Sequence, residues 1–278
     1  MRKILLYIVF GENKSYYDGA KFSLLTFMNW VSNKDPVEIV ILTENPDEFE
    51  SYPVTVFQMS TQQKTEWSLN GKYHFRIKNR GMAYIMDRLE LTEQDKILFL
   101  DADTYFHKSP LTLFDLIQPN QALFYLNEGL IYKRKRFNIY VKHLEGKSIE
   151  IEGRNYELSK QSILWGSLMV GIMPNMRPSL EWADLLMLKF YEIVPVHTID
   201  SFALSETLSR EYKIVEGKNF VSLYSTSRKK EYAIKVLTDF FIHNESKSIA
   251  EKVYLAQKVK IKRSIMTILK QRFSRLVK

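Results

Sequence analysis

The sequence predicts an α/β fold, with a mostly parallel sheet flanked by helices, and three observations support it. Short, mostly apolar runs that predict strands occur at residues 3–10 and 37–42, and an unbroken apolar run, typical of a strand that is covered on both faces, occurs at residues 97–100. Segments with apolar residues at helical spacing separate these runs, and strands that alternate with helices form doubly wound sheets. The third run ends directly in Asp101-Ala102-Asp103, which places charge at the carboxyl end of a strand, where open α/β sheets bind ligands.

The first helix is expected after a polar loop, residues 11–18, that follows the first strand. Ala20, Leu24 and Phe27 recur there at helical spacing, and Asp18 is the expected N-cap. Asp200 is the expected N-cap of a later helix, residues 201–208. The remaining predicted elements are strands at residues 54–59, 121–126, 163–172, 212–215, 220–224 and 239–243, and helices at residues 111–117 and 180–191 and around Met82, Ile85, Met86 and Leu89.

Length and composition predict a globular protein with one large domain and a distinct C-terminal segment. The chain has 278 residues, of which 45% are hydrophobic, and no cysteine, so thiolate metal sites and disulfides are excluded. From residue 251 onward there are nine Lys or Arg and one Glu, so residues 1–250 carry no net charge. This distribution argues against a nucleic-acid-binding domain. The apolar start is expected to be a strand, because Glu12-Asn13-Lys14 stands where a signal peptide needs small residues.

Asp101 and Asp103 predict a metal site. Two carboxylates at positions i and i+2 of an extended chain project to the same side, and keeping both ionised is unfavourable unless a cation lies between them. Mn²⁺ or Mg²⁺, bound by few protein oxygens, keeps coordination sites open for phosphate oxygens. This chemistry suits a nucleotide-sugar donor. The alternative is that the two residues only form an Asx-turn.

Two further groups of residues are candidates for binding that donor. The loop after the first strand contains Asn13, Tyr16 and Tyr17, which can hydrogen-bond to or stack on a base; the alternative is an ordinary surface turn. Arg76, Lys78 and Arg80 precede a helix at alternating positions, and cationic groups beside a metal-bound diphosphate would help to neutralise it. The alternative for these three residues is a solvated basic face.

The stretch FRIKNRGMAYIMDRL followed by KILFLDADTYF resembles the GT-A class of glycosyltransferases, and is most similar to family 8, the glycogenin and bacterial lipopolysaccharide galactosyltransferase group. The resemblance covers about residues 3–245 and implies a GT-A, Rossmann-like domain at residues 1–250. It implies that Asp101 and Asp103 bind Mn²⁺ and a UDP-sugar, with Ala102 between them. It also implies donor contacts from the residues Phe10, Gly11, Asn13, Arg76 and Lys78.

The resemblance implies a third metal ligand as well. Family 8 members supply a His after a late strand and then a Lys for the diphosphate, and DFFIHNESKS offers His243 and Lys247 at a similar place. The family's central Asn-Ala-Gly or Asn-Ser-Gly is replaced by Trp165-Gly166-Ser167, and its Asp-Gln-Asp by Asp200-Ser201-Phe202. Asp200 is therefore the candidate catalytic carboxylate on the acceptor side, and the retaining stereochemistry of the family stays open.

The predicted function is metal-dependent transfer of a hexosyl unit from a UDP-sugar to a hydroxyl group of a cell-envelope glycan or glycolipid. Residues 132–156, polar and basic without clear periodicity, are expected to form an excursion or lid on the acceptor side, or else a variable insertion. One rival is a carbohydrate-binding or scaffold protein without turnover. Another is a sugar-phosphate nucleotidyltransferase, which needs a glycine-rich loop where Phe10-Gly11-Glu12-Asn13 has a single glycine.

The C-terminal segment, residues 251–278, predicts a basic amphipathic helix. Its apolar residues recur at helical spacing, with Lys and Arg available on both sides of the stripe: Ile261, Ile265, Ile268, Leu269, Phe273 and Leu276. Such a helix suits an anionic membrane interface and predicts a cytoplasmic enzyme held peripherally on the inner face of the membrane. The alternative is a helix that packs on the domain or on a partner chain, and the oligomeric state is left open.

Overall fold

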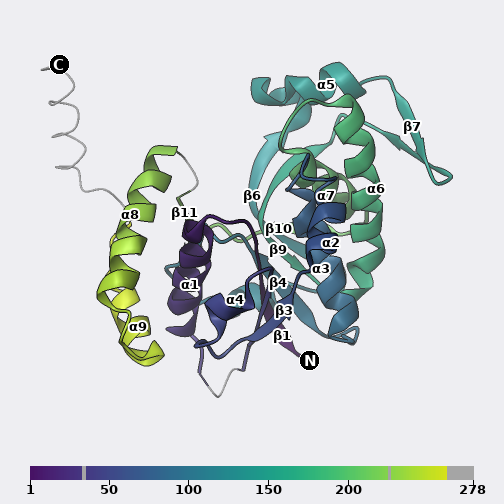
Figure 1. Cartoon of the computed structure of the whole chain (residues 1–278). Coiled ribbons are helices and arrows are strands. Elements are labelled where there is room, and N and C mark those ends of the chain that lie inside the picture. The colour runs from purple at the N-terminus through teal and green to yellow at the C-terminus, as the bar shows by residue number, and fades with distance from the viewer. Residues whose placement is uncertain (33–35, 225–226, 262–278) are drawn as a thin grey trace, which may run out of the picture.

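The computed structural model describes residues 1–32, 36–224 and 227–261. Within this part, the chain forms a seven-stranded sheet in the order β10-β6-β9-β4-β1-β2-β3 (Figure 1). Its strands are β1 (Lys3–Val9), β2 (Glu38–Thr43), β3 (Thr55–Gln58), β4 (Lys96–Leu100), β6 (Gln121–Leu130), β9 (Ile163–Ile172) and β10 (Lys213–Glu216). Two smaller pairings join β5 (Thr104–Phe106) with β11 (Val221–Leu223) and β7 (Ser148–Ile151) with β8 (Arg154–Glu157).

The mostly parallel sheet expected from the sequence is confirmed. β1 pairs in parallel with β2 and β4, β2 with β3, and β10 with β6. Among the described strands of this sheet, only β9 runs antiparallel to its neighbours, which are β4 and β6. The carboxyl ends of β1 and β4 therefore meet at one edge of the sheet.

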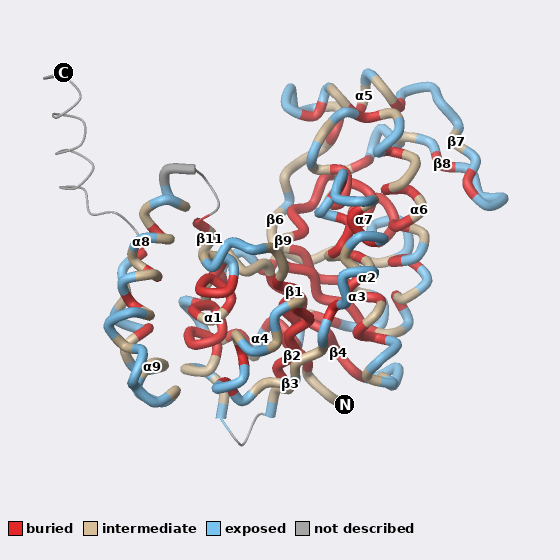
Figure 2. Tube along the Cα trace, viewed as in Figure 1, coloured by how far each residue is buried: buried red, intermediate tan, exposed pale blue. Residues whose placement is uncertain are grey.

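Helices cover both faces of the sheet, and alternate residues of each strand supply the two faces. Ile4 and Leu6 of β1 belong to the core cluster on the side of α3, α6 and α7, and Leu5 and Tyr7 to the cluster on the side of α1, α8 and α9. Figure 2 shows the buried strands between helices with exposed outer faces. The helices are α1 (Lys14–Met28), α2 (Thr61–Trp67), α3 (Arg76–Arg88), α4 (Leu111–Asp115), α5 (Asn138–Leu144), α6 (Arg177–Ile193), α7 (Ile199–Glu211), α8 (Ser227–His243) and α9 (Ile249–Ala256), with 3-10 turns at Pro46–Phe49, Ile131–Lys133, Lys135–Phe137 and Pro174–Met176.

Two predicted helix caps are wrong. α1 begins at Lys14 because the Asn13 side chain accepts a hydrogen bond of 3.0 Å from the backbone N–H of Ser15, which makes Asn13 the N-cap. Asp18 instead lies inside α1 and is buried, and burial raises the pKa of its carboxyl group. At the later helix, Thr198 holds the N-cap position and Asp200 is the second residue of α7. The predicted polar loop after β1 is thus largely helical.

The predicted strand at residues 239–243 is the last turn of α8. Leu237 and Phe240 face the core on the α1 side, while Ile242 is 64% exposed. A short apolar run such as Phe240-Phe241-Ile242 does not distinguish a strand from a helix, and the burial of residues three apart is the helical signature. This correction moves His243 to the end of a long helix.

Residues 131–157 form a folded part of the domain rather than a free lid. Their apolar side chains Phe137, Tyr140, Leu144 and Tyr156 are buried in the core cluster next to α6 and α7. The Tyr140 ring lies 4.2 Å from the ring of Phe202, and its hydroxyl shares a hydrogen bond of 2.7 Å with the hydroxyl of Thr198. α5 is therefore fixed against the beginning of α7.

α9 packs against α1, and Ala256 and Ile261 are buried in the cluster on that side of the sheet. The domain boundary predicted at residue 250 thus falls in the first turn of α9. The rest of the predicted amphipathic helix, beyond Ile261, lies outside the described residues. Among the described helices, none combines the length and the apolar composition that a membrane span requires.

Candidate active site

A cleft of about 520 Å³ opens at the carboxyl edge of the sheet, where β1 and β4 end. The beginning of α1, the first turn of α3 with the residues before it, and the first turns of α8 form its other walls. Of the residues predicted to bind the donor or the metal, those that line the cleft are Phe10, Gly11, Tyr16, Lys78, Asp101, Ala102 and Asp103. Those outside its lining are Asn13, Arg76, Asp200, His243 and Lys247.

The acidic turn Asp101-Ala102-Asp103 is held by its backbone. The N–H of Asp101 donates to the carbonyl of Leu168 in β9 at 2.8 Å, and the Thr104 hydroxyl donates to the carbonyl of Asp101 at 2.7 Å. On the other side, the N–H of Tyr224 donates to the carbonyl of Asp103 at 3.2 Å. The backbone groups of the turn thus have hydrogen-bond partners within the protein. The carboxylates of Asp101 and Asp103 are not used for these bonds, and both residues line the cleft.

Gly19 lets α1 approach this turn closely. A Cβ atom at Gly19 would lie 2.6 Å from the carbonyl oxygen of Ala102 and 2.9 Å from the hydroxyl of Tyr224. The Tyr224 hydroxyl itself donates to the Ala102 carbonyl at 3.3 Å. α1, the acidic turn and the segment before α8 therefore meet at a point with no room for a side chain on the helix.

The electrostatics of the cleft centre on Lys78 and the surrounding carboxylates. Burial raises the pKa of Asp101 to about 7; the Lys78 ammonium opposes this shift, and the carboxylates of Asp103 and Asp200 add to it. Burial also raises the pKa of Asp103, against the effect of Lys230. For Lys78, burial lowers the pKa, but Asp200 and Asp101 outweigh it and the pKa is raised. A further cation in the cleft would therefore be stabilised.

Asp200 lies behind Lys78 and not on the cleft surface. Its side chain is almost fully buried, and one carboxylate oxygen lies 2.7 Å from the Lys78 ammonium. The hydroxyl of Ser167 donates to the same oxygen at 3.2 Å and accepts from Lys78 at 2.8 Å. The backbone N–H of Asp200 donates to the Tyr73 hydroxyl at 2.8 Å. The predicted catalytic carboxylate is thus placed to orient Lys78 rather than to touch a substrate in the cleft.

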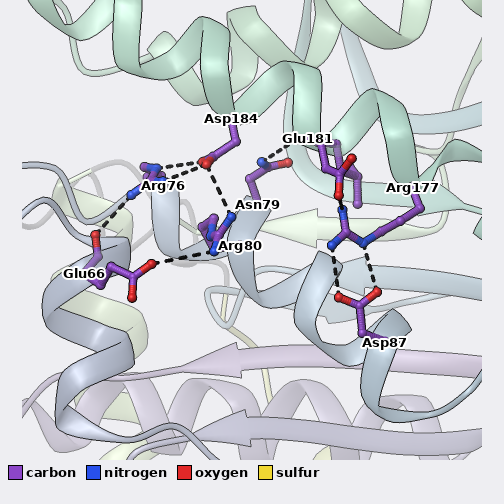
Figure 3. A network of polar contacts seen from close by, with 9 residues as sticks. Glu66, Arg76, Asn79, Arg80, Asp87, Arg177, Glu181 and Asp184 are labelled. Carbon is purple, nitrogen blue, oxygen red and sulfur yellow. Dashed lines mark hydrogen bonds and ion pairs between the residues drawn. The ribbon is translucent and has the colours of Figure 1, made fainter. Parts of the chain in front are cut away.

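Arg76 is also placed away from the cleft. Its guanidinium forms a two-pronged ion pair with the Asp184 carboxylate of α6, at 2.7 and 2.6 Å, and also donates to the carbonyl of Glu66 (Figure 3). The prediction that Arg76 and Lys78 point to one side assumed an extended chain. Because both residues belong to α3, where successive residues turn by 100°, positions i and i+2 point in nearly opposite directions.

His243 and Lys247 lie at the far end of α8. Lys230, in the first turn of that helix, lines the cleft, and His243 follows thirteen residues later, about 20 Å along the helix axis at 1.5 Å per residue. His243 is exposed, and its Nδ1 bonds to the carbonyl of Asp239 at 2.6 Å. Within the described ranges, no cluster of three or more His, Asp or Glu side chains suits a metal ion. The predicted ligand set with His243 is therefore not assembled.

Several cleft residues were missed by the sequence analysis. Lys230 stands over the ring of Tyr16, with its ammonium 5.4 Å from the ring centroid. His74 and the half-exposed Phe75 face the cleft together with Phe10, whose ring lies 6.4 Å from that of His74. In α8 the buried residues are spaced by three and four, and this spacing is the signal that could have predicted the helix and placed Lys230 near its start. The sequence holds no comparable signal for His74 or Phe75.

The acidic turn fits a divalent cation bound by few protein groups. Asp101 and Asp103 both face the cleft, and two carboxylates are enough for Mg²⁺ or Mn²⁺ when substrate phosphates complete the coordination. Burial raises the pKa of both groups, and the nearby lysines do not fully offset the cost of holding two buried carboxylates ionised. These two residues would hold the metal.

The fold is that of the GT-A class of glycosyltransferases: a mostly parallel sheet with one reversed strand, and an acidic turn after β4 at the carboxyl edge. A solved galactosyltransferase, LgtC in complex with donor and acceptor sugar analogs, has this fold. The two structures agree with a TM-score of 0.52 at 11% sequence identity, over 76% of this chain and 73% of that one. At this identity, the likeness establishes the fold alone.

Two other solved structures are less similar. Mouse xyloside xylosyltransferase 1 gives a TM-score of 0.49 at 15% identity, over 78% of this chain and 85% of that one. A 4-diphosphocytidyl-2C-methyl-D-erythritol synthase gives a TM-score of 0.45 at 13% identity, over 86% and 99%. These two carry no further argument. Comparison of the sequence with protein-family models and with curated proteins finds no match.

Proposed function

We propose that the protein is a metal-dependent glycosyltransferase that moves a hexosyl unit from a UDP-sugar to a hydroxyl group of a cell-envelope glycan or glycolipid. The observation that carries the proposal is the placement of Asp101, Asp103 and Lys78 together in a cleft at the carboxyl edge of a GT-A sheet. A nucleotide diphosphate needs positive charge, and this cleft combines two candidate metal ligands with two lysines, Lys78 and Lys230.

The chemistry divides between the metal and the residues of the chain. Mn²⁺ or Mg²⁺ held by Asp101 and Asp103 supplies positive charge to a diphosphate leaving group. Lys78, kept protonated by its carboxylate neighbours, adds a fixed charge on one side of the cleft, and Lys230 adds a second on the other. Phe10 and His74 offer ring surfaces on which a uracil base would stack. Retention of configuration is proposed on the family 8 resemblance alone.

The test is UDP release from a panel of UDP-sugars in the presence of Mn²⁺. Asp103→Ala and Asp101→Ala should each lower turnover by at least about 100-fold, because each removes a metal ligand and no apolar contact. Asp115→Ala, on the exposed side of α4, is the matched control and should retain activity. Addition of EDTA should abolish activity of the unaltered protein. Unchanged Mn²⁺-dependent activity in Asp103→Ala would refute the proposal.

A binding protein without turnover is the second candidate, because His243, the predicted third metal ligand, lies at the far end of α8 from the cleft. It predicts that the protein binds UDP equally well with EDTA and with Mn²⁺, and releases no UDP from any UDP-sugar of the panel. Binding can be measured by calorimetry under both conditions, so the two candidates give opposite results in one pair of experiments.

The proposed location is the inner face of the cytoplasmic membrane, through the basic residues of the C-terminal segment. This part of the proposal rests on the sequence of residues 262–278, with its Lys and Arg beside an apolar helical stripe. The described beginning of the segment, α9 and Ile261, packs on the domain. Membrane attachment therefore has to come from the residues after Ile261.

A further inference from the structure

A strongly basic surface follows the end of β6, at the edge of the sheet where the cleft opens, and has no part in the donor chemistry described above. Residues 131–147 contain six Lys or Arg and one Glu, although residues 1–250 as a whole carry no net charge. All six cations are exposed. We call them the basic rim: Lys133, Arg134, Lys135, Arg136, Lys142 and Lys147.

The sheet brings the basic rim to the same edge as the acidic turn. β4 ends at Leu100, opposite Met169 of β9, but β6 and β9 continue to pair beyond this point, as far as Leu130 opposite Ile163. The basic rim starts at the end of this two-stranded extension, in the turns that connect β6 to α5. It therefore stands beyond the carboxyl edge of the sheet, where the cleft opens.

A chain of direct contacts links the basic rim to the cleft. α5, which carries Lys142, is fixed by the hydrogen bond between Tyr140 and Thr198 at the N-cap of α7. Two residues later, Asp200 forms its ion pair with Lys78, which lines the cleft. The rim is thus on the α7 side, away from the cleft wall formed by α1 and α8.

Most of the charge of the rim is available to a partner. Arg136 is paired with Glu128 at 2.7 Å and lies over the ring of Phe137. No ion pair between described residues involves Lys133, Arg134 or Lys135. Three adjacent exposed cations without a carboxylate repel one another, and an anionic ligand would relieve that repulsion.

The surroundings of the rim favour a hydrated anionic ligand over a bilayer. Binding in a membrane interface uses apolar side chains next to the cations. The large apolar side chains of this segment face inward instead: Ile131, Phe137, Tyr140 and Leu144 are buried. The exposed large hydrophobic side chains of the described residues lie elsewhere in the sequence.

We propose that the basic rim binds the carboxylate or phosphate groups of the acceptor, so that the acceptor is an acidic saccharide. This inference rests on the proposed function, because the donor cleft is what makes a neighbouring surface an acceptor site. A saccharide whose reacting hydroxyl reaches the cleft would place its adjoining units over the rim. Carboxylate or phosphate groups on these units would form charge-assisted hydrogen bonds with lysine and arginine.

The test compares two double substitutions that remove the same charge from the full-length protein. Lys133→Gln with Lys135→Gln alters the rim, and Lys72→Gln with Lys213→Gln alters two exposed lysines elsewhere. The probes are fluorescein-labelled hexagalacturonate and, as the neutral control, labelled maltohexaose. We expect the unaltered protein to prefer hexagalacturonate, the rim variant to bind it about tenfold more weakly at low salt, and the control variant to be unaffected.

Each contrary result has a distinct meaning. Equal losses in both double variants, or equal affinity for maltohexaose, would overturn the proposal. Tighter binding of phosphatidylcholine-phosphatidylglycerol vesicles or of single-stranded oligo-dT, lost in the rim variant, would also overturn it and assign the surface to a bilayer or to nucleic acid. The binding assay contains no donor, and UDP release is measured separately with water as acceptor. A failure of the proposed function is therefore seen independently of the rim.

Discussion

Asp101 lies at the end of a strand, and burial raises the pKa of its carboxyl group from 3.8 to about 7. In the metal-free protein, between about pH 4 and about pH 7, the Asp101 carboxyl group of the folded state keeps a proton that the same group has already released in the unfolded chain. Stability contributed at low pH is therefore lost as the pH rises from about 4 to about 7, because the unfolded state then binds fewer protons than the folded state. Asp103, whose pKa is also raised, acts in the same direction.

Asp101→Asn tests this pH dependence. In EDTA, the thermal midpoint of the unaltered protein should fall between about pH 4 and about pH 7, and the substitution should flatten that fall. Asp115→Asn, at an exposed carboxylate of α4, should leave the slope unchanged. A slope that is the same in all three proteins would show that the Asp101 carboxyl group does not titrate in this window.

At the scale of elements, the contact between α1 and the acidic turn depends on Gly19. Gly19→Ala would place a methyl group 2.6 Å from the Ala102 carbonyl, so the helix or the turn must move. We expect a loss of about 1–3 kcal/mol in the free energy of unfolding, and weaker UDP release because the carboxylates are displaced. Helix propensity alone predicts the opposite sign, a gain of about 1 kcal/mol. Urea unfolding of Gly19→Ala and of the unaltered protein therefore distinguishes the two expectations by the sign of the difference in unfolding free energy.

The packing of α3 on α6 depends on the buried pair of Arg76 and Asp184, whose side chains are each 8% exposed (Figure 3). Asp184→Ala leaves a buried guanidinium without its partner and should cost about 3–5 kcal/mol of unfolding free energy. Asp87→Ala removes a partner of Arg177 between the same two helices, but Asp87 is 59% exposed, so the cost should be below about 1 kcal/mol.

A companion variant separates charge burial from packing. Arg76→Met combined with Asp184→Leu removes both charges, and we expect it to recover most of the stability that Asp184→Ala loses. Denaturant unfolding of these variants measures their free energies of unfolding. Similar costs for Asp184→Ala and Asp87→Ala would mean that burial of the Arg76 pair has no energetic consequence.

The elements differ in how far the sequence predicts them. β4 and its acidic turn were predictable because a strand covered on both faces leaves an unbroken apolar run that ends abruptly in charge. The end of α8 was not, because three consecutive apolar residues suit either a strand or a helix. Arg76 and Lys78 were both predicted to face the donor, but Arg76 pairs with Asp184 of α6 and only Lys78 lines the cleft. Which residue faces which way depends on where α3 begins, and neither residue type marks that boundary.

At the scale of the whole molecule, the packing of α9 determines how membrane attachment should be tested. A protein truncated after residue 250 would lose α9 and the buried Ala256 and Ile261, and is expected to be destabilised. Truncation after residue 261 keeps this packing. We expect it to retain UDP release and its thermal midpoint but to lose binding to anionic vesicles at low salt. Full vesicle binding by this shorter protein would refute attachment through the C-terminal segment.

The hydrogen bond between Tyr224 and Ala102 spans 122 residues of sequence, and Lys230 comes later still. During synthesis, the strands β1, β2 and β4 leave the ribosome well before either residue does. The two carboxylates therefore exist for much of translation without the wall that carries Tyr224 and Lys230. The cleft is therefore complete only when nearly the whole domain has been made, so under the proposed function a nascent chain would have no complete cleft with which to bind the donor.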